Sequence, residues 1–179
     1  AWEEGLGYTS YILQYITQLS SSLCINFDTS YGINDSAGLE ELLDFTIATF
    51  GPTGIYNFAD ATVGRSTSSF AFYLANVYDR CDVRSFVLKH FTDTDAVECI
   101  NALFWCEDVT DVNDVQFKNS YERKLEHITL GSGFEPESTW LSTHGGYNDA
   151  NHHHLDLGSF VFDCDGVRWA MELGSDSYN

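Results

Sequence analysis

Apolar residues recur with helical spacing through the first part of the chain, up to Glu107. Positions three and four apart lie on one face of an α-helix, so each such stripe predicts an amphipathic helix. The stripes cover residues 8–19, 39–50, 70–78, 83–91 and 95–106. Polar capping residues precede several of them, and Gly51-Pro52 ends the second. This part of the chain is therefore predicted to form five helices.

The pattern changes after Glu107, where short β-prone runs alternate with turn residues. Near the end of the chain, Asp165-Gly166 separates two apolar runs and predicts a β-hairpin, because these residue types readily adopt the positive φ that a tight turn needs. Helices followed by strands indicate the α+β class. We expect a helical part, residues 1–107, and an antiparallel β part, residues 108–179.

The net charge of the chain is strongly negative. Eight Lys and Arg stand against 27 Asp and Glu, which gives −19 over 179 residues. This argues against nucleic acids and anionic membranes as partners, and no apolar run is long enough to span a bilayer. The five scattered cysteines are expected to be buried free thiols. The chain starts inside what reads as a motif, so we expect it to be a piece of a longer polypeptide.

Residues 151–174 carry the candidate chemistry. In an extended chain, residues i and i+2 point the same way, so His152 and His154 are expected to share a face and His153 to face away. Two imidazoles on one face can bind a metal, or one can transfer protons while the other binds. Asp156 can orient a histidine or cap a turn.

The same residues, HHHLDLGSF followed by DGVRWAMELG, resemble the signature of the heparinase II/III-like proteins. WEEGLGYTSY near the N-terminus and WLSTHGGYN resemble two further motifs of that family, with His144 in place of the usual Lys. The resemblance implies an α/α toroid joined to an antiparallel β-sandwich. It also implies a polysaccharide lyase that cleaves an acidic, uronic-acid-containing polysaccharide by β-elimination. Such proteins are often periplasmic or secreted, whereas unpaired cysteines also fit the cytoplasm.

Position by position, the resemblance implies roles for single residues. Tyr8 and His152 match the catalytic tyrosine and histidine of the family. His154 matches a zinc ligand, and Glu172 stands where the family has an Asp ligand. The third zinc ligand and the group that neutralises the substrate carboxylate are expected in the rest of the parent polypeptide. Substrate-binding or supporting roles are expected for three more residues, Tyr11, Asp156 and His144.

The spacing of the predicted zinc ligands does not by itself support a shared metal. A two-residue turn at Asp165-Gly166 pairs Glu172 with Ser159. Ser159 lies five residues beyond His154, which is too far for one metal in a straight ladder. A bulge or bend near Gly158 would be needed to bring the two side chains together.

Two alternatives to the lyase stay open. One is a cupin-like metal enzyme that uses His152 and His154. Cupins, however, need a Glu where this chain has Gly158 or Ser159. The other alternative is a non-catalytic carbohydrate-binding piece that zinc braces. Asn57 and Asp60 are expected to close a loop by hydrogen bonds, with lining of the cleft as the alternative, and His127 is expected to be structural.

Overall fold

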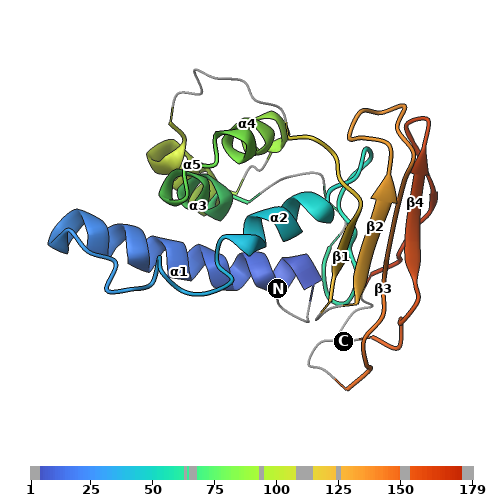
Figure 1. Ribbon diagram of the computed structural model, residues 1–179, viewed down its shortest axis with the longest axis horizontal. Coiled ribbons are helices and arrows are strands. Elements are labelled where there is room, and N and C mark those ends of the chain that lie inside the picture. The colour runs from blue at the N-terminus through green and yellow to red at the C-terminus, as the bar shows by residue number, and fades with distance from the viewer. Residues whose placement is uncertain are drawn as a thin grey trace. The chain divides into compact units, whose positions relative to one another are not determined.

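The computed structural model describes residues 5–62, 64, 68–92, 95–107, 115–123, 126–149 and 154–174. Helices come first and strands second, which confirms the α+β class (Figure 1). The helices are α1 (Gly5–Phe27), α2 (Glu41–Ala48), α3 (Phe70–Val77), α4 (Cys81–His90) and α5 (Ala96–Trp105). The strands are β1 (Ser120–Glu122), β2 (His127–Gly131), β3 (Trp140–His144), β4 (Phe160–Cys164) and β5 (Val167–Ala170). Each of the five predicted helical stripes coincides with one of these helices.

The chain divides into two compact units. The sheet unit contains residues 1–9, 45–65 and 116–179, and the helical unit contains residues 10–44 and 66–115. The described residues 5–9 and 45–62, which the sequence pattern groups with the helices, therefore fold with the sheet. The two-domain organisation with a boundary near residue 107 stays a prediction.

The helical unit has a core of aromatic and aliphatic side chains. Here α3 packs against both α4 and α5. Five side chains at the centre of these helices are buried: Phe70, Leu74, Val83, Val87 and Trp105. At the start of α5, the Asp95 carboxylate accepts hydrogen bonds from the backbone N–H groups of Val97 and Glu98 and so caps the helix.

The buried face of α1 differs from its apolar stripe. Tyr11, Tyr15 and Leu19 belong to the stripe, yet they are 57%, 56% and 55% exposed. Leu13 and Thr17 are buried instead. The Thr17 hydroxyl donates to the Leu13 carbonyl at 2.8 Å, so this polar side chain is satisfied within the helix and can be buried at little cost. The stripe thus predicts where the helix forms, but not which side of it is covered.

Two further expectations from composition concern the cysteines and membrane-spanning helices. All five cysteines are free, as predicted, although none is fully buried. In the described part of the chain, no helix combines the length and the apolar character that crossing a membrane requires.

The five strands form one antiparallel sheet in sequence order, β1-β2-β3-β4-β5. Figure 1 shows β2, β3 and β4 as neighbours in this layer. The predicted hairpin at Asp165-Gly166 joins β4 to β5, with φ of 52° and 75° at the two turn residues. Two successive positive φ angles are the mark of the tight turn that matches strand twist. A second sheet, which a sandwich would need, does not occur among the described residues.

Polar side chains make up most of the buried face of the sheet. Trp140 and Val161 supply its apolar contacts, and both are fully buried. The other buried side chains of β2, β3 and β4 are His127, Thr129, Ser142, His144 and Asp163. Large apolar side chains of the sheet are exposed instead, among them Leu130, Phe160 and Trp169. Because buried polar groups must be hydrogen-bonded, this face depends on specific partners more than on hydrophobic fit.

An ion pair within the sheet anchors the chain that follows α2. The Arg168 guanidinium binds both oxygens of the fully buried Asp163 carboxylate, at 2.8 and 3.1 Å. The same guanidinium donates to the carbonyls of Gly54 and Ile55, each at 2.9 Å. The Asp163 carboxylate also accepts from the Thr53 backbone N–H. Residues 53–55 are therefore tied to β4 and β5 by three charge-assisted hydrogen bonds.

The Trp140 indole is fully buried beneath the Arg168 guanidinium, which lies 5.8 Å from the ring centroid, and its packing can be tested by truncation. A Cβ on Gly51 would lie 2.5 Å from the indole ring, so the chain approaches as closely as glycine allows. Trp140→Ala should lower the free energy of unfolding by about 3–5 kcal/mol, because it leaves a cavity in the core. Urea denaturation followed by circular dichroism measures this loss.

The matched control is Trp169→Ala, on the edge strand β5 of the same sheet. Trp169 is 70% exposed, so its truncation should cost less than about 1 kcal/mol. Equal losses for the two variants would contradict the packing of Trp140 described above.

Candidate functional site

Residues 56–61, here called the 56–61 segment, lie at the centre of the candidate site. All of them except Asp60 are at most 1% exposed. Ala59 has a φ of 53°, which is uncommon for a residue with a Cβ. The segment follows directly on residues 53–55, which the Arg168 guanidinium holds. Its irregular backbone is thus fixed at one end by the sheet.

The start of α1 packs on the same segment through two glycines. Gly5 has a φ of 83°, and a Cβ there would lie 2.7 Å from the Phe58 carbonyl oxygen. A Cβ on Gly7 would lie 3.3 Å from the Ala61 Cα. Glycine allows this close approach of two backbones. Tyr8, the predicted catalytic tyrosine, follows immediately and is half-buried.

The chain after the predicted histidine pair also binds the 56–61 segment. His154 Nε2 lies 2.9 Å from Asp60 Oδ1. Two residues on, the Asp156 carboxylate accepts a hydrogen bond from the Ala59 backbone N–H at 3.3 Å. Leu155, between them, is 89% exposed. His154 and Asp156 therefore face the segment together, with the alternation that an extended chain predicts.

His144 lies behind this contact, almost fully buried. Its Nδ1 is 2.8 Å from the Tyr56 hydroxyl, and its Nε2 is 3.4 Å from Asp156 Oδ1. The Phe58 ring stacks on the imidazole with 4.6 Å between centroids. At 3% exposure, His144 has no room to contact a polymer directly, which favours the supporting role among its predicted roles. Asp156 lies beside His144 and binds the 56–61 segment, so it joins the two.

Tyr56 has the strongest electrostatic constraint in the site. Burial raises the pKa of its phenol far above the usual range, and the carboxylates of Glu172 and Asp156 raise it further. Hydrogen bonds with Ser159 oppose this shift. The phenol therefore keeps its proton at every physiological pH and acts as a structural donor.

His127 lies on the other side of Tyr56, fully buried. Its ring stacks with those of Tyr56 and Phe58, and its Nε2 lies 2.7 Å from the Ser142 hydroxyl. Desolvation, with a smaller contribution from the nearby His144, lowers the pKa of His127 to about 4. This imidazole is neutral in the folded protein at pH 7, in keeping with its predicted structural role.

The two predicted zinc ligands have separate partners. The Glu172 carboxylate accepts from the backbone N–H groups of Leu173 and Gly174, at 3.0 and 3.4 Å, whereas His154 contacts Asp60. The ladder does bulge, but between Phe162 and Asp163. The bulge pairs Phe162 with Ala170, so continuing this register would place Glu172 opposite Phe160, one residue farther from His154 than in the regular ladder.

No group of three His, Cys, Asp or Glu side chains in the described ranges could hold a metal ion. The resemblance places only two of the three zinc ligands in this chain, and these two, His154 and Glu172, contact different groups. Zinc itself stays a prediction that metal analysis of the protein would test.

Two predicted site residues, His152 and Tyr11, remain. His152, the predicted catalytic histidine, lies outside the described residues. Tyr11 is an exposed residue of α1 in the helical unit and packs edge-to-face on Tyr15. The catalytic and substrate-binding roles of these residues stay predictions.

The 56–61 segment contributes more to the site than its sequence indicates. Asn57 and Asp60 do form hydrogen bonds, and their partners, the Glu172 carbonyl and His154, belong to residues 151–174 with the candidate chemistry. Tyr56 was not singled out at all. The available signal was a long loop with no apolar stripe but many apolar residues, which marks a buried connection.

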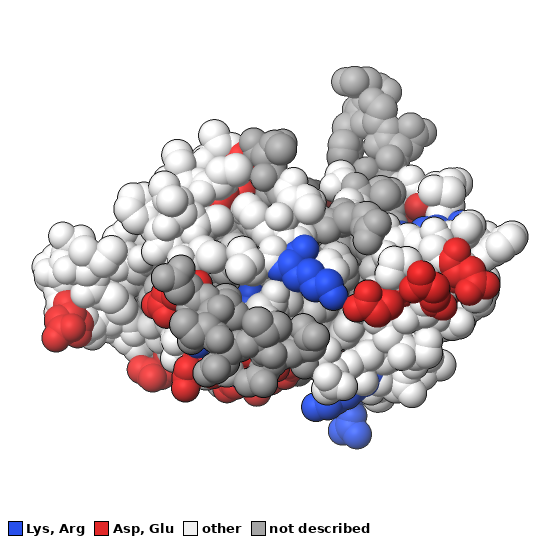
Figure 2. Space-filling view, turned by 90° about the horizontal axis from the view of Figure 1, so that it is seen from above, with Lys and Arg blue, Asp and Glu red and all other residues white. Residues whose placement is uncertain are grey.

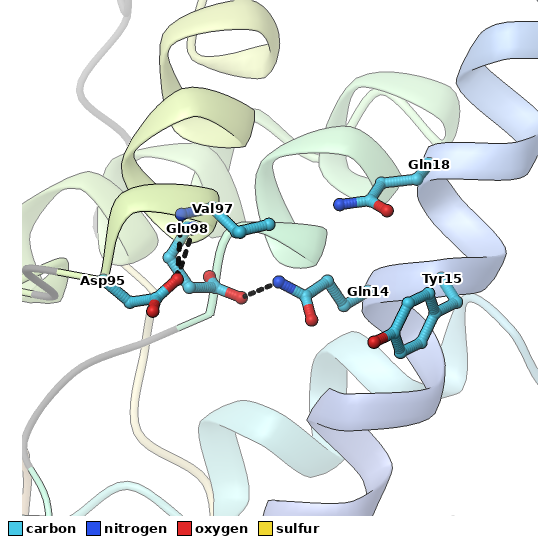
Figure 3. A pocket seen from close by; sticks show the side chains of 6 residues that line it. All are labelled: Gln14, Tyr15, Gln18, Asp95, Val97 and Glu98. Atoms are coloured by element: carbon cyan, nitrogen blue, oxygen red, sulfur yellow. Dashed lines mark hydrogen bonds between the residues drawn. The ribbon is translucent and has the colours of Figure 1, made fainter.

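A separate pocket occurs in the helical unit, between α1 and α5 (Figure 3). It has a volume of about 470 Å³ and is lined by Gln14, Tyr15, Gln18, Asp95, Val97 and Glu98. Gln14 Nε2 donates to Glu98 Oε1 at 3.2 Å, and Asp95 caps α5. Its polar side chains are thus committed to helix contacts, and we assign it no chemistry.

Comparison with known proteins supports the fold. No protein-family model matches the sequence, and no curated protein is similar to it in sequence. Among solved structures, a mutant of the heparan sulfate lyase HepC from Pedobacter heparinus is similar, with a TM-score of 0.69 and 13% identity. A heparinase III is also similar, with a TM-score of 0.62 and 13% identity. At this identity the likeness concerns the fold alone, which is heparinase-like at a distant level.

The likeness extends over nearly all of this chain but little of the other proteins. It covers 96% and 97% of this chain, and 25% of each of the two neighbours. The chain therefore spans about a quarter of their length, and the activity of a whole protein is a matter for proposal.

The neutral state of His127 makes stability depend on pH. Its pKa is about 4 in the folded protein, against 6.5 for an ordinary histidine. Between these values the unfolded chain binds a proton that the folded protein does not, so the free energy of unfolding falls as pH decreases from 6.5 toward 4. The full loss from this group is about 3 kcal/mol. Above pH 6.5 the stabilisation is fully present.

Urea denaturation of the protein and of His127→Gln, at a series of pH values, measures this effect. Between pH 4 and 6.5, the slope of unfolding free energy against pH should be smaller in the variant by up to about 1.4 kcal/mol per pH unit. Ser142→Ala serves as control, because it removes the partner of His127 but keeps the titrating imidazole. Parallel curves for the protein and His127→Gln would show that the imidazole is not buried as described.

Proposed function

We propose that the polypeptide containing this chain is a polysaccharide lyase that cleaves uronic-acid polymers by β-elimination. The observation that carries the proposal is the 56–61 segment. Both the start of α1, which bears Tyr8, and the extended chain at His154 pack against it. These are the two elements for which the family resemblance predicts the catalytic groups. The heparinase-like fold, seen in a heparan sulfate lyase, agrees with this reading.

The chemistry requires groups of the predicted kinds. β-Elimination removes the proton at C5 of a uronate and breaks the bond between C4 and the glycosidic oxygen, which leaves a double bond between C4 and C5. A base must take the C5 proton while an acid protonates the departing oxygen. The phenol of Tyr8 and the imidazole of His152 can divide these two tasks. Because charge develops on the substrate carboxylate, fixed donors or a cation must stabilise it, and we expect those groups elsewhere in the polypeptide.

The residues behind the site would serve as its support. Asp156 binds Ala59 and lies beside His144, which in turn contacts Tyr56. A neutral His127 and a protonated Tyr56 keep uncompensated charge out of this support. Rigid support matters because misplacement of a reacting group by about 1 Å can cost a hundredfold in rate.

The acidic surface is the main constraint on an anionic substrate. Acidic side chains outnumber basic ones on the face in Figure 2, and the net charge is −19. At physiological salt, charges more than about 8 Å apart are largely screened. A local cationic or donor-rich site can therefore bind a uronate although the surface as a whole repels it.

Ultraviolet absorbance gives a direct test. The complete polypeptide is incubated with heparan sulfate, hyaluronan, chondroitin and alginate, and the conjugated double bond of each product is followed. At least one polymer should give a rise in absorbance, which hydrolysis cannot produce. Tyr8→Phe and His152→Ala should each lower kcat by about a hundredfold or more, the usual contribution of a proton-transferring group, while circular dichroism stays unchanged.

Tyr15→Phe is the matched control, since it removes the same hydroxyl from an exposed position of the same helix. It should leave kcat unchanged. Full turnover in Tyr8→Phe or His152→Ala would remove that residue from the mechanism. No absorbance rise with any polymer would count against the lyase and favour a non-catalytic carbohydrate-binding protein.

A further inference from the structure

We propose that Asp60 is a positioning residue, which holds the His154 imidazole by a hydrogen bond from Nε2–H and so fixes the chain at the predicted histidine pair. The significance for catalysis rests on the proposed function. The hydrogen bond itself does not, and it can be tested in a protein without measurable activity.

The proton of the hydrogen bond between His154 and Asp60 can be assigned to one of the two side chains. His154 Nε2 and Asp60 Oδ1 are 2.9 Å apart, a hydrogen-bond distance. The Asp60 side chain is only 7% exposed, and that of His154 is 28% exposed. An ionised carboxylate can only accept. The proton therefore sits on His154 Nε2, and the lone pair that a metal would need at this nitrogen is not available.

A second hydrogen bond lies next to the contact between Asp60 and His154. Ala59, next to Asp60, donates its backbone N–H to the Asp156 carboxylate. Neighbouring residues of the 56–61 segment thus hold His154 and Asp156, two positions apart on the facing chain. Two such contacts fix both the position and the rotation of an extended chain, which a single hydrogen bond does not.

Further contacts hold the 56–61 segment in place independently of the chain at His154. The 56–61 segment is anchored by the Arg168 guanidinium at residues 54 and 55 and contacted by Gly5 and Gly7 of α1. The segment is therefore the fixed partner, and the chain at His154 is aligned on it. Asp60 is the side chain of this segment that contacts an imidazole and so orients it. The Glu172 carboxylate instead accepts a hydrogen bond from the Leu173 backbone N–H, so it is not needed to hold His154.

Nuclear magnetic resonance of protein with ¹⁵N-labelled histidine tests the hydrogen bond. His154→Ala assigns the signal. In the zinc-free protein, His154 should show a protonated Nε2, with a slowly exchanging proton that is lost in Asp60→Ala. Asp60→Asn keeps the shape and a neutral acceptor, so it should retain the proton with faster exchange. Asp28→Asn, the same change at an exposed residue, should leave the signal unchanged.

Adding one equivalent of Zn²⁺ separates positioning from metal binding. The Nε2 proton should persist. Its disappearance, together with loss of bound zinc in both Asp60→Ala and His154→Ala, would make the two residues metal ligands and overturn the proposal. A wild-type protein whose Nε2 is unprotonated without zinc would overturn it as well.

Activity then tests the positioning role. With the polymer that gives the absorbance rise, Asp60→Ala should lower kcat about 10- to 100-fold, the range expected for a misaligned reacting group, with KM changed less than about threefold. Asp60→Asn should restore part of this loss. Normal kcat in Asp60→Ala, with the Nε2 proton lost, would overturn positioning while the lyase reading stands. A wild-type protein inactive on all polymers would count against the lyase and leave the hydrogen bond to be decided by resonance alone.

Discussion

The buried pair of Asp163 and Arg168 is the constraint from which the sheet unit is organised. Its charges lie inside the protein, where an unpaired ion would cost several kcal/mol, so both side chains must keep all their partners. Those partners include the carbonyls of Gly54 and Ile55. The pair thus joins the last hairpin of the sheet to the chain that enters the 56–61 segment. The position of the candidate site depends on an interaction that has no part in its chemistry.

The polar side chains that the sheet buries form sets connected by hydrogen bonds and close contacts. His127, Ser142 and Thr129 form one set, and Tyr56, His144, Ser159 and Asp156 form another. Side chains from separate parts of the chain link each set, and the Phe58 ring stacks on the imidazoles of both. Such networks are sensitive to the loss of one member, because the remaining partners are left buried without a hydrogen bond.

Local patterns predicted the elements, and non-local contacts decided the site. The helices and the Asp165-Gly166 hairpin follow from spacing and turn chemistry within a few residues, so all were predicted. The buried face of the sheet was not, because apolar alternation favours Leu130 and Phe160 over the polar residues that are actually covered. Asp156 was expected either to orient a histidine or to cap a turn, but its position beside His144 was not predicted. The partner of His154 is 94 residues away in the chain, and no periodicity reports such a pairing.

The long separations within the site have a consequence for how the protein is made. Tyr56 pairs with a residue 88 positions later, Asp60 with one 94 later, and Asn57 with one 115 later. At a synthesis rate of about 5–20 residues per second, the 56–61 segment would wait about 5–20 s on the ribosome for its partners. During that time its apolar side chains have no sheet to cover them. Early translation products of this chain are therefore the state most exposed to aggregation and most dependent on chaperones.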